Sequence, residues 1–178
     1  MTTVTLPTVP PPPKSRAGTG RLLPLPGRYT VAPGRSLAEL TAWYGPLPTR
    51  RRRVRLAGAS LDVSGPRSDT DTQTLLTEAE RPRFRFDFDD RRGLKAALTA
   101  EEVHESDGRL QLSGDLDLND VAFPVLLRLR VVERADDRLL VVGTARLPYR
   151  LLRRATGFRL PWRVPATRLR LLVAAEFA

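Results

Sequence analysis

The chain has 178 residues, a formal net charge of +10 at pH 7 and no cysteine. Without cysteine, disulfides, thiolate catalysis and cysteine-ligated metal sites are excluded, and the single histidine, His104, leaves little scope for zinc or for a Ser-His-Asp triad. A hydrophobic content of 41% predicts one folded domain with its own core.

Arginine carries nearly all of the positive charge, because Lys14 and Lys95 are the only lysines. A basic surface favours nucleic acid or anionic lipid as a partner, and the alternative is that the charge serves solubility. No apolar run approaches the ~18 residues of a membrane span. The first twenty residues lack the basic and apolar regions of a signal peptide, so we expect a cytoplasmic protein.

Residues 1–26 are rich in proline, threonine and glycine, with four consecutive prolines from Pro10 to Pro13. This composition is typical of polyproline II or coil and predicts a disordered tail. Residues 27–178 are then the folded domain.

Alternation of apolar and polar residues with period two predicts strands over most of that domain. A short first strand at 27–31 is interrupted at Pro33-Gly34, and residues 36–44 fit either a strand or a helix. Further strands are predicted at 53–63, 83–89, 94–105, 109–118, 121–133, 139–147 and 167–177.

Two segments do not alternate. Asp69 to Glu80 has an acidic, threonine-rich start and a following Pro82, which predict a short helix. Tyr149 to Gly157 fits a short basic helix or an irregular crossing.

A long antiparallel series leaves two open edges, and closing the sheet into a barrel removes both. The predicted fold class is therefore all-β, an antiparallel barrel with one short helix. One face of each strand would line the interior. The residues in the inward phase are Phe84, Phe86, Phe88, Leu110, Leu112, Gly114, Leu116, Leu118, Val121, Phe123, Val125, Leu127, Leu129, Val131 and Gly143.

Several motifs resemble those of the YceI-like proteins. The run from Gly114 to Leu118, followed by Pro124-Val125-Leu126-Leu127, is similar to the family's "G-D-L-T-I-x-G-V-T-x-P-V-T-L" hairpin. Gly27 to Pro33, followed by Ser36, resembles its opening "G-x-W-x-I-D-P-x-x-S", and Arg81 to Phe86 resembles the segment that ends in "P-x-I-x-F". The resemblance implies a lipocalin-like barrel that holds a polyisoprenoid, a quinone or a fatty-acid derivative in its lumen.

The chain departs from that pattern in places that bear on the lumen. Asp120 stands where the family has the hairpin glycine, and Ala122 where it has threonine. The family's histidine after the first strand is missing, its "R-D-x-H-L" motif is degraded to Thr70 to Leu75, and the stretch from Ser36 to Val54 is short. A shortened wall would narrow the lumen or leave it filled by side chains.

The inward side chains are the predicted ligand-binding residues, and the alternative is that they form a filled core, as small barrels often have. Burial of ten ligand methylenes, at ~0.8 kcal/mol each, would contribute about 8 kcal/mol before ordering costs. The predicted ligand-binding set is Phe84, Phe86, Phe88, Leu112, Leu116, Leu118, Phe123, Val125, Leu127, Leu129, Leu169 and Leu171.

Arginines form the predicted surface contact. Arg50, Arg51, Arg52 and Arg53 are expected to form a basic loop run that touches an anionic membrane. Other arginines fall on the outward phase of strands, where the alternative is a solvated wall. These are Arg55, Arg83, Arg85, Arg128, Arg130, Arg168 and Arg170. Because the phenylalanines point inward, no stacking platform for a specific nucleic acid is expected.

No catalytic or metal site is expected. Asp115 and Asp117 point outward without shielding, so a catalytic dyad is not predicted, and His104 reads as an exposed residue rather than a metal ligand. The predicted function is non-catalytic binding or sequestration of a long apolar ligand, with no cofactor. The alternative is a basic scaffold with a filled core that contacts an acidic partner or an anionic membrane surface.

Overall fold

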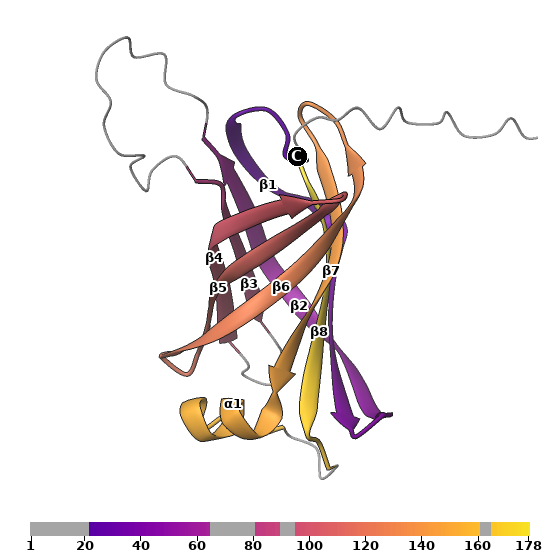
Figure 1. The fold of residues 1–178 in the computed structure, drawn as a ribbon, viewed down its shortest axis with the longest axis vertical. Coiled ribbons are helices and arrows are strands. Elements are labelled where there is room, and N and C mark those ends of the chain that lie inside the picture. Colours follow the sequence, from indigo (N-terminus) through magenta and orange to yellow (C-terminus); the bar gives the residue numbers. More distant parts are fainter. Residues whose placement is uncertain (1–21, 65–80, 90–94, 161–164) are drawn as a thin grey trace, which may run out of the picture.

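The computed structural model describes residues 22–64, 81–89, 95–160 and 165–178. Within these residues, eight strands form a closed antiparallel barrel in which each strand pairs with the next along the chain and the last pairs with the first (Figure 1). The predicted fold class is confirmed. The strands are β1 (Gly27–Tyr44), β2 (Leu47–Val63), β3 (Arg83–Asp89), β4 (Lys95–Ser106), β5 (Arg109–Leu118), β6 (Val121–Arg134), β7 (Leu139–Pro148) and β8 (Arg168–Phe177).

One helix, α1 (Tyr149–Thr156), follows β7 and lies across the lower end of the barrel in Figure 1. We call this end, with the β1–β2 and β5–β6 turns, the α1 end. The opposite end, which holds residues 22–26 and the β6–β7 turn, is the far end. No helix in the described part of the chain is long and apolar enough to span a bilayer.

The β5–β6 turn shows how Asp120 replaces the glycine of the resembling motif. Asn119 and Asp120 have φ angles of 53° and 60° and connect two strands that pair up to Leu118 and Val121. Two-residue hairpins need positive φ at both central positions, and Asn and Asp tolerate it better than other side chains. Asn119 also donates a hydrogen bond of 2.9 Å to the Thr156 carbonyl, which ties the turn to the end of α1.

The first strand is longer than the sequence predicts. The expected interruption at Pro33-Gly34 is wrong as a strand break, because β1 continues through it as a bulge: β1 advances from Val31 to Ser36 while β8 advances only from Phe177 to Ala175. Gly34 takes a φ of 73° within it. Residues 36–44 are strand, so their helical alternative is excluded.

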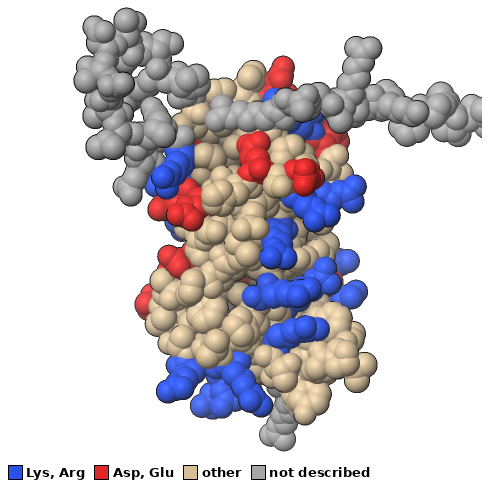
Figure 2. Space-filling model, in the orientation of Figure 1, with Lys and Arg blue, Asp and Glu red and all other residues tan. Residues whose placement is uncertain are grey.

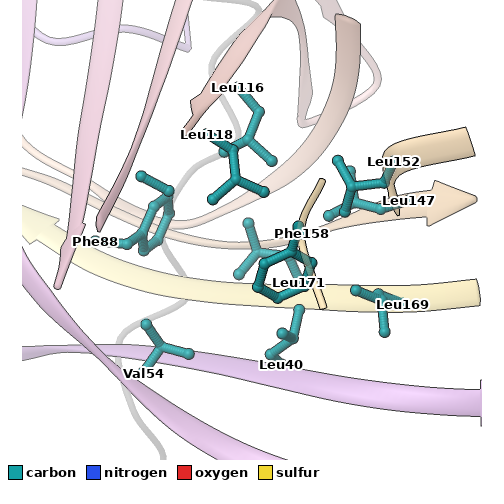
Figure 3. Close-up of a pocket in the computed structure, with 11 residues that line it drawn as sticks. Leu40, Val54, Phe88, Leu116, Leu118, Leu147, Leu152, Phe158, Leu169 and Leu171 are labelled. Carbon is teal, nitrogen blue, oxygen red and sulfur yellow. The ribbon is translucent and has the colours of Figure 1, made fainter. Parts of the chain in front are cut away.

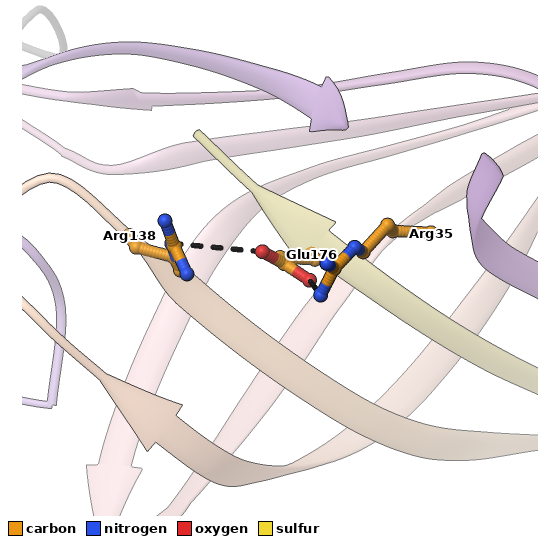
Figure 4. A network of polar contacts seen from close by, with 3 residues as sticks. All are labelled: Arg35, Arg138 and Glu176. Carbon is orange, nitrogen blue, oxygen red and sulfur yellow. Dashed lines mark hydrogen bonds and ion pairs between the residues drawn. The ribbon is translucent and has the colours of Figure 1, made fainter. Parts of the chain in front are cut away.

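Glu176 lies near the seam where β8 meets β1. Its carboxylate accepts a hydrogen bond of 3.1 Å from Arg35 Nη1 of β1, and Arg138 Nε, just before β7, lies 3.5 Å away (Figure 4). The Glu176 side chain is 9% exposed. One carboxylate therefore joins three neighbouring strands at the far end.

The far half of the lumen is filled by side chains. Phe84 and Phe86 stack with their centroids 6.2 Å apart, and Phe177 meets them edge-on at 5.8 and 6.0 Å. Leu23, inside the segment that the sequence assigned to the tail, is 1% exposed in this core, and its carbonyl accepts a hydrogen bond from Arg134. Residues 22–26 thus pack on the far end, while residues 1–21 lie outside the described residues.

Other expectations have mixed outcomes. The inward phase is confirmed for most of the interior, but Val121 is exposed because it sits at the very rim of the α1 end. The basic loop at Arg50 to Arg53 is wrong, because all four residues belong to β2, which begins at Leu47. The helix at 69–80 lies outside the described residues. Of the segment from Tyr149 to Gly157, residues 149–156 form α1, and Gly157 caps the helix in the left-handed conformation.

Gly143 should tolerate no side chain, because β7 approaches β6 closely there. A Cβ would stand 2.3 Å from the Arg128 carbonyl oxygen and 2.8 Å from the Leu129 Cα. Since backbone atoms cannot move aside, Gly143→Ala should lower the free energy of unfolding in urea by about 3 kcal/mol. Gly58→Ala is the matched control, because its nearest neighbour would be Asp87 Oδ2 at 3.8 Å. Equal urea midpoints for the two variants would contradict this packing.

Glu176→Gln should lower the free energy of unfolding by about 1 kcal/mol, because Arg35 and Arg138 lose a carboxylate that is largely shielded from solvent. Glu101→Gln is the control, because its pair with Arg83 at 3.2 Å is open to water on both sides. That change should stay within about 0.3 kcal/mol. Urea unfolding at neutral pH measures both changes. An effect at Glu101 as large as that at Glu176 would refute the claim that Glu176 stabilises the junction between β8 and β1.

Candidate ligand-binding cavity

A cavity of about 40 Å³ lies in the half of the lumen next to the α1 end (Figure 3). Every side chain that lines it is apolar, so its walls offer a guest contact area and no side-chain hydrogen bond. The lining residues are Leu40, Val54, Phe88, Ala96, Leu116, Leu118, Leu147, Leu152, Phe158, Leu169 and Leu171.

The strands position most of this lining through their period of two. Leu169 and Leu171 alternate on β8, and Leu116 and Leu118 alternate on β5, so each pair points to the same face of the wall. Leu40 pairs directly with Leu171 across β1 and β8. Adjacent inward positions on neighbouring strands thus make a continuous apolar surface.

Leu152 and Phe158 line the cavity on the side of α1, and they are the lining residues that do not come from strands. Leu152 is buried on α1 together with Thr156, four residues on, so one stripe of the helix faces the barrel. Polar contacts hold the closing segment in place: Asn119 binds the Thr156 carbonyl, the Leu160 amide donates to the Tyr149 hydroxyl at 3.0 Å, and the Tyr149 amide donates to the Thr167 carbonyl at 3.1 Å. The cover therefore rests on a few local contacts rather than on a strand ladder.

The cavity is small in this closed form. An engineered apolar cavity of about 150 Å³ in another protein admits benzene, and the present cavity has about 40 Å³. It accommodates a methyl or a short piece of chain. A longer chain does not fit within this volume.

The structure brings five of the predicted ligand-binding residues together at this cavity: Phe88, Leu116, Leu118, Leu169 and Leu171. The other seven lie elsewhere in the wall or the core. Phe84 and Phe86 pack on Phe177 in the far half. Leu112, Leu127, Leu129 and Val125 are buried, and Phe123 is half-buried against the core.

Six lining residues were not in the predicted set: Leu40, Val54, Ala96, Leu147, Leu152 and Phe158. Leu40 lies in the segment that fitted both strand and helix. Val54 and Leu147 lie on predicted strands, and extending the alternation to them would have identified them as inward residues. Leu152 and Phe158 had no such signal, because they follow the last alternating residue of β7. The sequence signal for Leu152 was an apolar residue among the arginines of a short predicted helix, and Phe158 lies beyond that helix.

Acidic side chains gather at one place on the outer surface. A surface depression at the α1 end of β3, β4 and β5 is lined by Asp87, Asp89, Asp117 and Asp120 around Lys95. Hydrogen bonds from Arg85 to Asp87, at 3.0 and 3.2 Å, raise the pKa of the Arg85 guanidinium. Asp115 and Asp117 are exposed on β5, and His104 is exposed on β4. No group of three or more acidic or histidine side chains in the described residues could hold a metal ion.

The predicted contact Arg50 to Arg53 follows the alternation of β2. Arg51 and Arg53 point outward, and Arg51 pairs with Glu39 at 3.0 Å. Arg52 is half-buried opposite Leu40, at the rim of the lumen. The alternation of β2 thus sets successive arginines on opposite faces of the strand, and their contact with a membrane stays a prediction.

A closed eight-stranded antiparallel barrel with an apolar interior is a lipocalin-like fold. The crystal structure of Burkholderia cenocepacia BcnA is similar to this chain, with a TM-score of 0.52 and 13% sequence identity over 82% of this chain and 98% of that protein. This likeness supports a YceI-like or lipocalin-like fold, and at that identity it shows the fold alone. A scan of protein-family models and a search of curated proteins found no match, so membership of the YceI-like family stays a prediction.

Leu152→Ala tests whether α1 is packed as a cover. Leu152 is fully buried, so its truncation should lower the free energy of unfolding by about 2–3 kcal/mol. Leu151→Ala, on the exposed side of the same helix, should change it by less than about 0.5 kcal/mol. Urea denaturation followed by circular dichroism measures both, and similar values for the two variants would mean that α1 does not seal the barrel.

Proposed function

We propose that the protein binds a slender apolar ligand in the barrel lumen and catalyses no reaction, with entry beneath α1. The observation that carries this proposal is the wholly apolar cavity at the end that a helix closes. The likeness of the fold to BcnA and the YceI-like motifs support it. The proposal includes a cytoplasmic location and no cofactor.

The energetics suit a long chain rather than a compact guest. Each buried methylene contributes ~0.8 kcal/mol, so burial of a tail of about ten carbons would contribute more free energy than the several kcal/mol of entropy that the ligand loses on binding. Displacing Leu152 and Phe158 costs their burial and a few hydrogen bonds, and the guest's own contacts would replace that burial. A rigid polycyclic ligand would instead have to push apart paired strands.

The proposed ligand class is an isoprenoid, a quinone or a fatty-acid derivative, each of which has a flexible hydrocarbon tail. Because the lining is apolar, recognition would depend on the length and thickness of the tail and little on the head group. The head group would remain near the α1 end, where the lumen meets solvent.

A second candidate is a basic interaction protein whose core is filled. The small volume of the closed cavity and the phenylalanine trio in the far half favour it. The two functions differ in one measurable property, which is whether the purified protein takes up a hydrocarbon chain.

Leu171→Phe should weaken uptake of a fluorescent fatty-acid analogue, because the larger ring fills the cavity. We expect the apparent affinity to fall at least tenfold, about 1.4 kcal/mol. Leu172→Phe is the matched control, since Leu172 is the next residue on β8 and faces outward in register with Glu39. Its affinity should equal that of the unmodified protein.

Native mass spectrometry of freshly purified protein supplies the independent measurement. An adduct of lipid mass that Leu171→Phe loses and Leu172→Phe keeps would support lumen binding. A bare polypeptide mass from several expression hosts, together with no uptake of the analogue, would refute it and leave the filled-core candidate.

A further inference from the structure

Exposed apolar side chains gather at the end of the barrel where the cavity is closed. Leu151 on α1 is 59% exposed, and Tyr44 and Leu47 beside the β1–β2 turn are 54% and 65% exposed. Several large apolar side chains exposed at one end of a molecule are typical of a contact site, whereas single scattered ones are ordinary. Figure 1 shows α1 and the β1–β2 turn at the same, lower end of the barrel, α1 on its left side and the turn on its right.

Hydrogen bonds through Thr167 join these two elements. The Thr167 amide donates to the Trp43 carbonyl at 2.7 Å, and its carbonyl accepts from the Tyr149 amide at 3.1 Å. Its hydroxyl also accepts from the Gly45 amide at 3.3 Å. The start of α1 and the β1–β2 turn are therefore held in fixed relation.

Arginines surround the exposed leucine of the helix. Arg150, Arg153 and Arg154 are exposed and, with Tyr149 and Ala166, line a groove of about 490 Å³. None of the three forms an ion pair with a residue in the described parts of the chain. Figure 2 shows basic side chains clustered at this lower end, without acidic side chains among them in this view.

The wall above this end carries the same charge. Arg146 of β7 lies directly opposite Arg170 of β8, and like charges in that position are destabilising. Arg168 lies over the Trp43 ring at 5.1 Å from its centroid. An arrangement that concentrates arginines next to one another is compatible with a partner that brings many negative charges to one surface.

We propose that the α1 end docks on an anionic phospholipid surface. Arginines would contact lipid phosphates, and the exposed leucines and tyrosine would enter the boundary between head groups and acyl chains. A nucleic acid would match the charge but would leave Leu151 and Leu47 without an apolar environment. The inference rests on the proposed function, because docking at this end would bring the cavity's closing segment to the source of an apolar ligand.

The test is sedimentation with vesicles of phosphatidylcholine, with or without about one-third phosphatidylglycerol. The full chain should bind the anionic vesicles, bind neutral vesicles far less, and dissociate as salt is raised. Replacing Arg150, Arg153 and Arg154 together by Gln should weaken anionic binding about 100-fold, or roughly fivefold for each arginine. Leu151→Ser should weaken it by about tenfold with the charge unchanged.

The matched control removes three positive charges elsewhere, through Gln at Arg81, Arg109 and Arg130. This control should bind anionic vesicles nearly as well as the unmodified protein. All variants should have the same thermal melting temperature as the unmodified protein. Equal losses in the two triple variants would overturn the proposal, as would tighter binding to a DNA duplex that the α1 variant loses. Because vesicle binding needs no guest in the lumen, a failure of docking is distinguishable from a failure of lumen binding.

Discussion

Pairing of β1 with β8 is the constraint on which the rest of the structure depends. It converts an open series of strands into a barrel, removes both sheet edges and gives every inward side chain an apolar neighbour. β1 meets that demand with a bulge between Val31 and Ser36, which lets an 18-residue strand follow two neighbours of different length. Glu176 and its two arginines secure the seam at the far end.

The two halves of the barrel interior differ in how they are packed. In the far half, three phenylalanines and Leu23 pack together and are fully buried, so this part acts as a conventional core. In the other half, leucines of modest size meet a helix instead of a further ring of strand residues, and a cavity remains. On the outer surface, aspartates gather at the α1 end of β3 to β5, and arginines gather on α1 and on the neighbouring strands β7 and β8.

Much of the fold could be predicted because alternation is a local property. Phe84, Phe86 and the leucines of β5 show their phase in the sequence itself, and five cavity residues follow from that phase alone. The sequence does not show where along the barrel a strand residue lies. Val121 has the inward phase but is exposed because it lies at the rim. Arg50 to Arg53 have the composition of a loop, but β2 extends past the core and includes them. Leu152 and Phe158 become lining residues only because the chain crosses the lumen between β7 and β8, which no local pattern records.

That crossing has a further consequence, because α1 is anchored at both ends to two strands that are hydrogen-bonded to each other. A few hydrogen bonds and one buried stripe hold the helix on the barrel, so opening it locally would break no strand ladder. Its amide protons would therefore exchange with solvent through a local fluctuation, at a lower free energy than those of the strands. The local stability of this segment would therefore be set by a handful of contacts and not by the strand ladders that hold the barrel together.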